Sequence, residues 1–417
     1  MTRREADCVI VGGGIGGAVL ALALGRKGRR VVVLERETRP LPAGRPEVLA
    51  GATLEIFDSL GVGSRIREQA ALPIRGLEAW RAGRDRLLAL TEEDIREAGA
   101  APHSTDPGLT RQLLMEAAEA AVEVVRGVEV RELITDGSRV IGVRGVRGGE
   151  AISVNARLVV GDDGPHSKVR EGLGIALPAT NFALDFLAAA GPALPGLRND
   201  IGEAWIDPWG VRRGLPAALF LPLPGARTAM VFLLSPGAYR RFSKLDPQVF
   251  HRAAVRLTPR AAELDSVHKF PEGFAHITRP FGHAQRYVAD GAALLGDAAH
   301  PVTPAGGQGA NMSAADAAVL TEVADAALAR GDCGADALRS YESIRRPANE
   351  RSLRFSSRTH NVLRLLQVMP LMAPLLPLGL GMVDRRPALR QRFIRSIAEA
   401  FRSDRSATRA DTCASAR

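Results

Sequence analysis

The sequence has few cysteines and few aromatic residues, and these shortages exclude several classes of protein. Its three cysteines are Cys8, Cys333 and Cys413, and no Cys-x-x-Cys pair is present. We therefore expect neither a disulfide framework nor a metal site, and a reducing, cytoplasmic setting fits best. Aromatic residues make up 5% of the chain, and no basic stripe is interleaved with them. Nucleic acid is thus not an expected partner, despite the net charge of +9.

An uninterrupted apolar segment of membrane-spanning length is also missing. Residues 365–383, LLQVMPLMAPLLPLGLGMV, carry no charge, but Pro370, Pro374 and Pro377 interrupt them. Because interior prolines remove helix hydrogen bonds, we expect helical turns that cover a cavity or touch a membrane surface peripherally. The apolar run after Arg4 leads into glycines without a cleavage pattern, so we predict a strand there and not a signal peptide.

Residues 6–35 predict a strand, a glycine-rich turn, a helix and a second strand. The turn VGGGIGG has the G-x-G-x-x-G spacing of a dinucleotide site. In that pattern, Gly12 permits the tight turn, Gly14 lets the backbone approach a pyrophosphate, and Gly17 lets the helix pack closely on the strand. Glu35 ends the second strand, where an acid accepts hydrogen bonds from the adenosine ribose. The pattern therefore indicates a nucleotide but does not distinguish NAD from FAD.

The rest of the chain alternates between helical and strand-like segments. We predict a helix over about 109–125, a short strand in 157–164, a buried strand in 291–300 and a long amphipathic helix over 308–330. Between about 176 and 275 the pattern changes to short apolar segments broken by proline and glycine, which indicates a β-rich insert. The chain thus leaves its first domain and returns to it. Residues 402–417 are typical of a solvated, disordered tail.

A second glycine-rich loop indicates which nucleotide binds. The sequence GDAAHPVTPAGGQGANMSAADAAVL, residues 296–320, joins a buried strand to a helix. Asp297 is placed to accept hydrogen bonds from a polyol chain, and Gly306, Gly307 and Gly309 let main chain approach a flat ring. The following helix directs its positive end at that ring, as suits a reduced flavin with negative charge near N1 and C2=O. These features favour FAD.

Three motifs in this order resemble those of the single-component FAD-dependent aromatic hydroxylases, which have the p-hydroxybenzoate hydroxylase fold. They are the glycine turn with Glu35, the Asp-Gly motif GDDGPHSKVR at 161–170 and the Gly-Asp motif at 296–311, with LTRQLL and YESIRRP as further similar stretches. The resemblance covers roughly residues 6–350. It implies an α/β fold with a Rossmann-like FAD-binding domain, an inserted β-sheet-rich substrate domain and C-terminal helices. The boundaries we expect are 1–70, 100–175 and 276–345 for the FAD-binding domain, 71–99 and 176–275 for the substrate domain, and 346–417 for the C-terminal helices and tail.

The resemblance also implies roles for particular residues. Glu35 would hold the adenosine ribose, Arg111 would lie along the FAD, Arg45 would approach the flavin, and Asp297 would bind the ribityl chain. The Asp-Gly motif would lie near the pyrophosphate and take part in the encounter with NAD(P)H. The full set of expected cofactor-binding residues is Gly12, Gly14, Ile15, Gly16, Gly17, Glu35, Arg36, Arg45, Arg111, Asp163, Gly164, Asp297, Pro304, Gly307, Gly309, Ala310 and Asn311.

Some positions have simpler interpretations. Asp162 stands where the family commonly has alanine, which leaves the Asp-Gly pair intact. Asp163 alone is also compatible with a turn. His300 is usually structural in this family, and the Trp205 and Trp209 pair is more often part of a core than of a substrate site. No spacing identifies a catalytic residue, so the chemistry is expected to centre on the flavin.

The activity implied is a monooxygenase that uses NADPH or NADH and O2. In such enzymes a flavin C4a-hydroperoxide hydroxylates or epoxidises the substrate, here an apolar aromatic, polyketide or prenylated compound, in what would be natural-product biosynthesis. Two alternatives remain open at this point: an FAD-dependent reductase of the geranylgeranyl reductase type, and a non-catalytic FAD-binding protein. A halogenase is disfavoured because WIDPW is not its W-x-W-x-I-P motif. We expect a monomer or homodimer.

Overall fold

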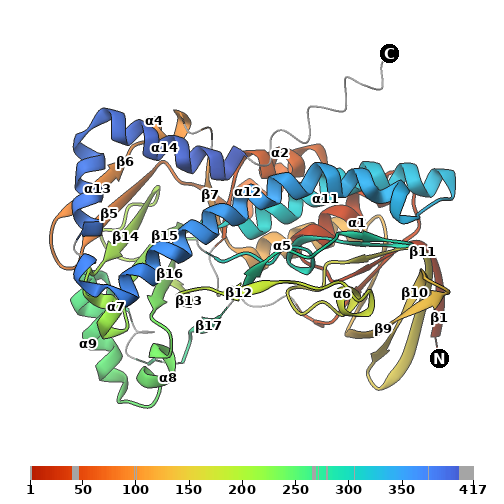
Figure 1. Cartoon of the computed structure of the whole chain (residues 1–417), viewed down its shortest axis with the longest axis horizontal. Helices are drawn as coiled ribbons and strands as arrows, with labels where there is room; N and C mark the ends of the chain where they lie inside the picture. The colour runs from red at the N-terminus through yellow and green to blue at the C-terminus, as the bar shows by residue number, and fades with distance from the viewer. Residues whose placement is uncertain are drawn as a thin grey trace.

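Two large β-sheets lie side by side and are joined by long helices in the computed structural model of the chain (Figure 1). The structure describes residues 2–39, 47–97, 99, 101–264, 269–270, 272–278, 280–304, 306–373 and 375–402.

The first sheet has eight strands and a parallel centre. Its order is β19-β20-β11-β1-β2-β8, and the β9–β10 hairpin pairs with the first half of β11. β1 lies between β2 and β11 and is parallel to both, which gives the doubly wound order of a nucleotide-binding fold. The strands are β1 (Thr2–Val11), β2 (Val31–Glu35), β8 (Glu123–Arg126), β9 (Val128–Asp136), β10 (Arg139–Arg147), β11 (Glu150–Gly161), β19 (Val288–Ala289) and β20 (Ala292–Leu294).

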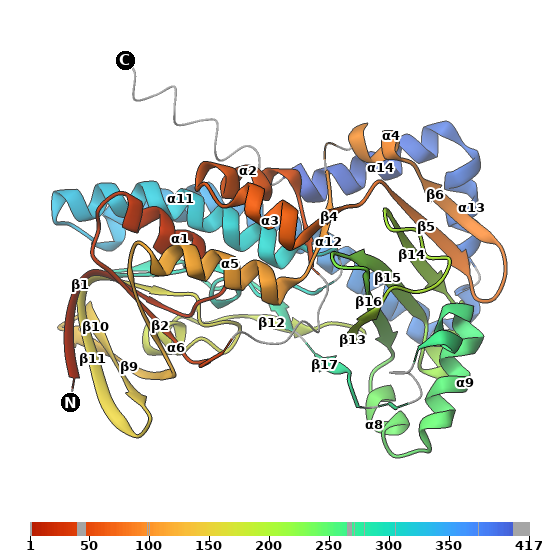
Figure 2. The ribbon, with the colours of Figure 1, turned by 180° about the vertical axis from the view of Figure 1, so that it is seen from behind.

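Three helices cover one face of this sheet in both ribbon views: α1 (Ile15–Arg26), α5 (Pro107–Glu119) and α11 (Gln308–Arg330) (Figures 1 and 2). α1 contacts both α5 and α11. Such close packing requires small residues, and a Cβ added to Gly16 would lie 2.3 Å from the Cδ2 atom of Leu295. Small side chains in α1 therefore bring its first turn down to the carboxyl end of the sheet.

Shorter elements complete this half of the molecule. β3 (Glu47–Leu49), β7 (His103–Thr105) and β4 (Ala71–Pro73) form a three-stranded sheet, and β12 (Ala179–Asn181) pairs with β18 (Pro280–Gly282). The remaining elements are α2 (Gly51–Ser59), α3 (Gly63–Gln69), α6 (Lys168–Gly172) and the 3-10 turn η2 (Gly296–Ala298).

The second large sheet has seven strands, in the order β17-β13-β16-β15-β14-β5-β6. Most neighbours are antiparallel, whereas β14 and β5 are parallel. The strands are β17 (Ala275–Ile277), β13 (Asp185–Pro192), β16 (Arg227–Leu234), β15 (Ala217–Leu223), β14 (Ile201–Ile206), β5 (Gly76–Arg81) and β6 (Arg86–Leu90). The helical segments near it are α4 (Glu92–Glu97), α7 (Gly210–Arg213), α8 (Ala238–Phe242), α9 (Pro247–Leu257) and η1 (Pro259–Glu263).

The C-terminal helices connect the two halves. α12 (Ala335–Val368) contacts α11 at the first sheet and α7 near the second, and it runs along the length of the molecule (Figure 1). After η3 (Pro370–Met372), α13 (Leu375–Arg385) packs on β6, and α14 (Pro387–Arg402) follows. Among the described residues, no helix combines the length and apolar character needed to cross a membrane.

The predicted fold class is confirmed, and the helix over 308–330 has the predicted bounds. The predicted helix over 109–125 is wrong in its last part, because α5 ends at Glu119 and Val124 and Val125 belong to β8. β8 pairs with β2, so the strand preference of two valines is reinforced by a long-range partner. At 291–300 only three residues form a strand before the chain turns into η2. The predicted disordered tail lies outside the described residues from residue 403 on.

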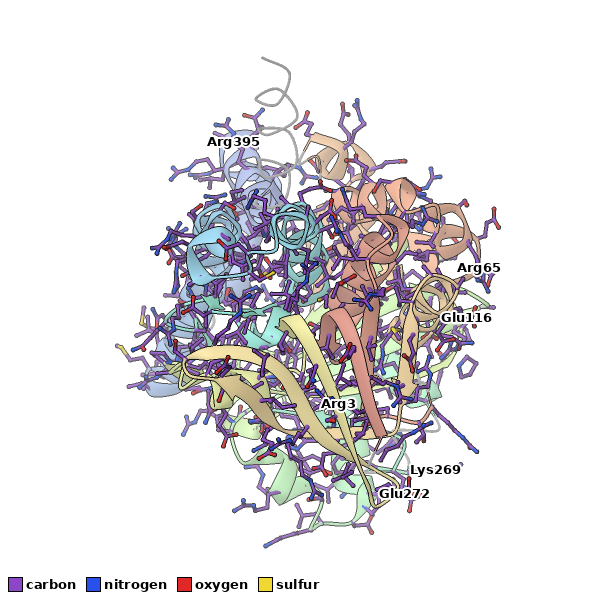
Figure 3. All side chains as sticks on the ribbon, turned by 90° about the vertical axis from the view of Figure 1, so that its right-hand side faces the viewer. Arg3, Arg65, Glu116, Lys269, Glu272 and Arg395 are labelled. Atoms are coloured by element: carbon purple, nitrogen blue, oxygen red, sulfur yellow. The ribbon has the colours of Figure 1, made fainter. Side chains whose placement is uncertain are left out.

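Charged side chains of both signs are interspersed at the surface near the first sheet (Figure 3). One pair labelled there joins helices α3 and α5, with 2.7 Å between an Arg65 nitrogen and a Glu116 oxygen. Exposed pairs of this kind contribute little to stability, commonly less than about 1 kcal/mol. On this face the charged side chains therefore do not form a single-sign stripe.

Candidate active site

A single cavity of about 700 Å³ connects the two glycine-rich loops with the seven-stranded sheet. One end is lined by cofactor-binding residues expected from the sequence, namely Gly14, Ile15, Gly164, Asp297, Pro304, Gly307, Gly309 and Ala310. The other end is lined by apolar side chains. Motifs from widely separated parts of the sequence therefore meet around one space.

The first glycine turn is fixed by contacts that leave no room for a side chain. A Cβ added to Gly12, whose φ is +105°, would lie 2.2 Å from the carbonyl oxygen of Asp162. A Cβ added to Gly17 would lie 2.3 Å from the carbonyl oxygen of Gly12. The turn between β1 and α1 is thus held directly against the end of β11, which requires glycine at both positions.

The N-termini of two helices open on the cavity, and each has glycine as its cap residue. α1 begins after Gly14 and α11 after Gly307, and neither cap residue has a side chain to accept a hydrogen bond from the first turn. First-turn N–H groups have no partner within a helix, and the helix dipole adds partial positive charge there. The two termini therefore fit a cofactor with negative charge at two places, such as a pyrophosphate and a reduced flavin ring.

Glu35 does not line the cavity itself but lies next to the glycine turn, at the end of β2. Its two carboxylate oxygens accept hydrogen bonds from the backbone N–H groups of Gly13 and Glu37, each at 2.7 Å. The Arg111 guanidinium lies 3.2 Å from Glu35 Oε2. Both residues are thus held next to the glycine turn. Arg36 lies outside this group because its side chain is 77% exposed and its nitrogen lies 3.4 Å from a Glu37 oxygen, and Arg45 is outside the described residues.

Asp163 and Asn311 have structural contacts that their motifs did not predict. Asp163 Oδ2 accepts hydrogen bonds from the N–H groups of Lys168 and Val169, so it caps the start of α6. Burial raises the pKa of Asp163, against the Ser167 and backbone hydrogen bonds that lower it. Neither Asp163 nor Asn311 lines the cavity.

Asn311 binds two neighbouring segments at once. Its oxygen accepts hydrogen bonds from Ala50 N–H at 2.8 Å and from the Thr53 hydroxyl at 2.6 Å. Its Nδ2 donates to the carbonyl oxygens of Val48 at 2.8 Å and Gly307 at 2.9 Å. The side chain is fully buried. It therefore fixes the Gly307 turn relative to β3 and α2, and its influence on a ligand passes through those segments.

A buried charged network lies under the Gly296 turn, and the sequence analysis assigned it no role. Asp316 of α11 accepts hydrogen bonds from Gly296 N–H at 3.3 Å, Arg345 Nε at 2.7 Å and Asn349 Nδ2 at 3.0 Å, and it also contacts His300. All four side chains that form the network are almost completely buried. Burial by itself raises the pKa of Asp316, but the charges of His300 and Arg345 together lower it below its ordinary value. The structural interpretation of His300 agrees with these contacts.

Asp162, for which the sequence predicted no role, contacts both glycine loops. Its Oδ2 accepts a hydrogen bond from Gly17 N–H at 2.7 Å, and its side chain lines the cavity. Its oxygens lie within 3 Å of the positions that a Cβ would take at Gly14 and at Gly296, so it stands between the two loops. Burial raises the pKa of Asp162 well above its ordinary value, and the charge of Asp297 raises it further. Asp162 is therefore neutral over a wider pH range than an exposed aspartate and places less negative charge beside a phosphate.

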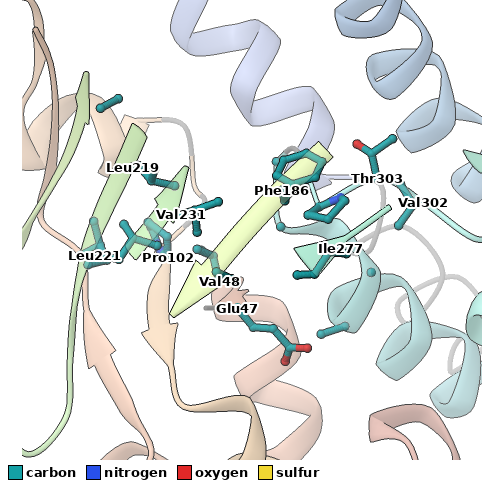
Figure 4. A pocket seen from close by; sticks show the side chains of 18 of the residues that line it. Glu47, Val48, Pro102, Phe186, Leu219, Leu221, Val231, Ile277, Val302 and Thr303 are labelled. Atoms are coloured by element: carbon teal, nitrogen blue, oxygen red, sulfur yellow. The ribbon is translucent and has the colours of Figure 1, made fainter. Parts of the chain in front are cut away.

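The apolar end of the cavity is formed by the inner face of the seven-stranded sheet and by the segment after η2. Figure 4 shows side chains from β15 and β16 on one side and the Val302–Thr303 segment on the other. The apolar lining residues include Val48, Ile74, Leu77, Leu90, Phe186, Ala188, Leu219, Leu221, Val231, Leu233, Ile277, Val302 and Ile394. Within the part of the chain that the structure describes, no group of three or more His, Cys, Asp or Glu side chains is arranged to hold a metal ion.

Fold and cavity together define an FAD-binding flavoprotein, and comparisons with known proteins agree. A family model described as FAD binding domain matches residues 5–356. Ubiquinone hydroxylase UbiL of Rhodospirillum rubrum is 30% identical, over 94% of this chain and 89% of its own. The 6-methylpretetramide 4-monooxygenase of Streptomyces rimosus is 28% identical, over 92% of this chain and 90% of its own. The crystal structure of P. aeruginosa PqsL in complex with 2-aminobenzoylacetate has a TM-score of 0.74 and 26% identity, over 89% of this chain and 100% of that one.

The chain belongs to the FAD binding domain family, among the single-component FAD-dependent aromatic hydroxylases. It is an FAD-dependent monooxygenase, and enzymes of this family use NAD(P)H as reductant. The reductase and non-catalytic alternatives are not favoured, since the relatives are monooxygenases and hydroxylases.

Replacing Asp316 with asparagine tests the buried network. We expect Asp316→Asn to lower the free energy of unfolding by about 3–5 kcal/mol, because the buried Arg345 guanidinium would lose its charged partner. Urea denaturation followed by circular dichroism measures this. The matched control is Asp336→Asn, whose side chain is 90% exposed and whose pair with Arg339 is on the surface, and it should change stability by less than about 1 kcal/mol. Equal effects of the two variants would contradict the assignment.

Replacing Asp162 with asparagine tests the raised pKa. A native acid whose pKa is raised retains a proton that the unfolded chain loses, so its presence lowers stability as pH rises above about 4. The FAD-free Asp162→Asn variant should therefore gain stability relative to the unmodified chain between about pH 4 and about pH 8. Denaturant titrations at both values measure the difference. The control, Asp58→Asn, should show little pH dependence over this range, because the hydrogen bonds from Arg67 lower the pKa of Asp58 and its contribution to stability changes only below about pH 4. A pH-independent difference for Asp162→Asn would refute the prediction.

Proposed function

We propose that this monooxygenase hydroxylates or epoxidises a large apolar aromatic, polyketide or prenylated compound, in natural-product biosynthesis. The observation that carries this proposal is the continuity of the cavity, which runs from the cofactor loops into a space lined almost entirely by aliphatic side chains. Such a lining favours an apolar substrate, because moving apolar surface out of water into the pocket lowers its free energy. The names of two relatives give ubiquinone as the substrate of UbiL and 6-methylpretetramide as the substrate of the Streptomyces rimosus enzyme. Both compounds would suit a pocket of this kind.

The residues around the cofactor end support a division of roles within this proposal. Glu35 and Arg111 would hold the adenosine ribose, and the N-terminus of α1, with Gly14, Ile15 and Gly16, would bind the pyrophosphate. Asp297 would bind the ribityl chain, and residues Gly307 to Asn311 would lie along the flavin ring, where Gly307, Gly309 and Ala310 line the cavity together with Pro304. Arg36, Arg45, Asp163 and Gly164 remain further candidates, and Asn311 would act by positioning Gly307. FAD supplies the oxidation chemistry when bound.

At the substrate end the protein would mainly orient the substrate and exclude water. Val48 and Val302, both labelled in Figure 4, lie next to Gly307 and Gly309, because a Cβ added to these glycines would lie 3.2 Å from Val48 and 3.5 Å from Val302. Aliphatic side chains there leave few groups that would hold water in place. The carboxylates that line the cavity are Glu47, Asp94, Asp162 and Asp297. Asp94 is bound to Arg390, which lowers its pKa although burial raises it. We assign none of these carboxylates a catalytic role.

Several broader features remain part of the proposal. The FAD-binding domain would comprise 1–70, 100–175 and 276–345, the substrate domain 71–99 and 176–275, and the C-terminal segment 346–417. In support, β5 and β6 join the same sheet as the strands of residues 185–277. The enzyme would be a cytoplasmic monomer or homodimer, use NADPH or NADH, and contact a membrane peripherally through 365–383.

Asp297→Ala should weaken FAD binding by roughly tenfold or more, which is the effect expected for losing a hydrogen bond to a charged group. Titration of the FAD-free protein, followed by quenching of flavin fluorescence, gives the dissociation constant. Asp336→Ala removes an exposed carboxylate of the same size and should leave it unchanged. Unchanged flavin affinity in Asp297→Ala would refute the role assigned to this residue.

The proposed reaction is tested with isotopically labelled molecular oxygen. In a screen of apolar phenols, polyketides and prenylated quinols with NADPH or NADH, one labelled atom should enter the product. Ala204→Phe or Ala217→Phe, each of which places a ring in the apolar end, should raise KM or abolish turnover while FAD binding is retained. Ala193→Phe, at an exposed position next to β13, is the control. Product without labelled oxygen would contradict a monooxygenase, and equal turnover in the cavity variants would contradict the assigned substrate site.

A further inference from the structure

Exposed apolar side chains gather at one place on the surface. Of the ten large apolar side chains that are exposed among the described residues, eight come from residues 362–382. They are Val362, Leu365, Val368, Met369, Leu371, Leu375, Leu378 and Met382. Leu371 is 81% exposed and Val368 is 75% exposed. Scattered exposed leucines are ordinary, but eight large exposed apolar side chains within one stretch of the chain indicate an interaction surface. We call this group the apolar patch.

The apolar patch is built on a part of the chain that is held in place on its other side. Leu380 and Val383 of α13 pack against a buried cluster that contains Leu88, Leu90 and Ile394. α13 therefore has one face in the protein and one face in solvent. Arg364 is the one charged residue between positions 362 and 382. This end of α12, η3 and α13 is thus rigidly attached and almost uncharged, unlike a solvated helix.

A basic groove lies directly beside the patch. This groove of about 460 Å³ is lined by Arg81, Ala82, Arg84, Asp207, Pro208, Trp209, Arg213, Arg256, Pro377 and Leu378. The four arginines come from β5, the turn after it, α7 and α9, and the last two residues belong to α13. Three segments far apart in the sequence, around residues 81–84, 213 and 256, therefore place positive charge at the edge of the apolar patch.

The positive charge of the groove exceeds its negative charge. Asp207 is the one acid in the lining, and it accepts hydrogen bonds from Arg213 at 3.2 Å and from Trp209 N–H at 2.9 Å. Arg84 and Arg256 are exposed, and within the described part of the chain neither has an ion pair. The Nε of Arg81 is buried and has no hydrogen-bond partner among the described residues. The groove therefore has unused donors for an anion with several oxygens, such as a phosphate group.

Trp209 connects the two features. It lies in the basic groove beside Leu378 and is 38% exposed, whereas Trp205 is buried and stacks on Trp80. Tryptophan is enriched where apolar chains meet the polar headgroups of a membrane, because its ring is apolar and its N–H is a donor. An apolar patch, a bordering tryptophan and a group of arginines form the combination that binds an anionic lipid surface.

We propose that the apolar patch inserts into the surface of a membrane containing anionic phospholipids, and that the basic groove binds a lipid phosphate. Leu77, Leu90 and Ile394 line the apolar end of the large cavity and belong to or pack on the cluster that carries α13. The docked face is therefore next to the substrate end of the cavity. This inference deepens the peripheral membrane contact proposed above for residues 365–383, and delivery of an apolar substrate from the bilayer rests on the proposed function.

The test is cosedimentation of the FAD-loaded, substrate-free enzyme with vesicles. Vesicles of phosphatidylcholine mixed with phosphatidylglycerol should bind the enzyme, and vesicles of phosphatidylcholine alone should bind it much more weakly. One basic residue near an anionic surface changes the membrane-binding constant by roughly fivefold, so Arg84→Gln combined with Arg256→Gln should weaken binding by roughly thirtyfold. Leu371→Glu with Leu378→Glu should weaken it by more than roughly tenfold. The matched controls, Arg330→Gln and Leu245→Glu, should bind like the unmodified enzyme.

Two further measurements make the result decisive. The fluorescence of Trp209 should shift to the blue on the mixed vesicles, and Trp209→Phe should remove that shift while leaving FAD binding intact. Equal binding to both vesicle types, or unchanged binding of the groove variants, would overturn the phosphate site. If no vesicle binds and Leu371→Glu with Leu378→Glu dissociates a dimer in sedimentation velocity, the patch is an interface between copies of this chain and the proposal is wrong. Because no substrate is present, none of these outcomes depends on the proposed reaction.

Discussion

The meeting of two helix N-termini, each with glycine as its cap residue, at one cavity is the constraint on which the rest of this structure depends. α1 and α11 begin 293 residues apart in the sequence, after Gly14 and after Gly307. Bringing two positive helix ends together is unfavourable unless negative charge lies between them. A bound dinucleotide would supply such charge. Without it, the protein must hold the two termini in place by other means.

Buried polar contacts hold the second terminus. Asp316 lies within α11 and is hydrogen-bonded to Arg345 of α12 and to the backbone of the Gly296 turn. These contacts hold α11, α12 and the Gly296 turn together as one unit. Asn311 connects the same helix to β3 and α2. Buried charges are costly unless every partner is present. The network therefore tolerates little movement, and a loop rich in glycine keeps a defined shape because its neighbours are rigid.

Features of the fold and site that depend on local sequence were predictable. Glycine at positions 12, 14 and 17, the acid at 35 and the helix from Gln308 to Arg330 all follow from spacing or periodicity within short windows. The end of α5 was not predictable in this way, because Val124 and Val125 are in a strand only through pairing with β2. Long-range partners explain the other omissions. Asp316 and Arg345 are 29 residues apart on different helices, and no spacing rule links them. The segment YESIRRP contains Arg345 and was noticed as similar to the family, but its function in the fold requires the packing of α12 on α11.

Asp162 shows how a departure from a pattern acquires meaning from its surroundings. In the sequence it is an acid where alanine is common, next to an Asp-Gly pair that remains intact. In the structure its carboxyl group accepts a hydrogen bond from the Gly17 N–H and lies between the two glycine loops. A charged group there would repel a pyrophosphate, whereas a neutral acid both accepts and donates hydrogen bonds. The burial that raises its pKa is produced by the same close approach of loops that requires glycine at position 12. One steric constraint therefore determines both the shape of this end of the cavity and its charge.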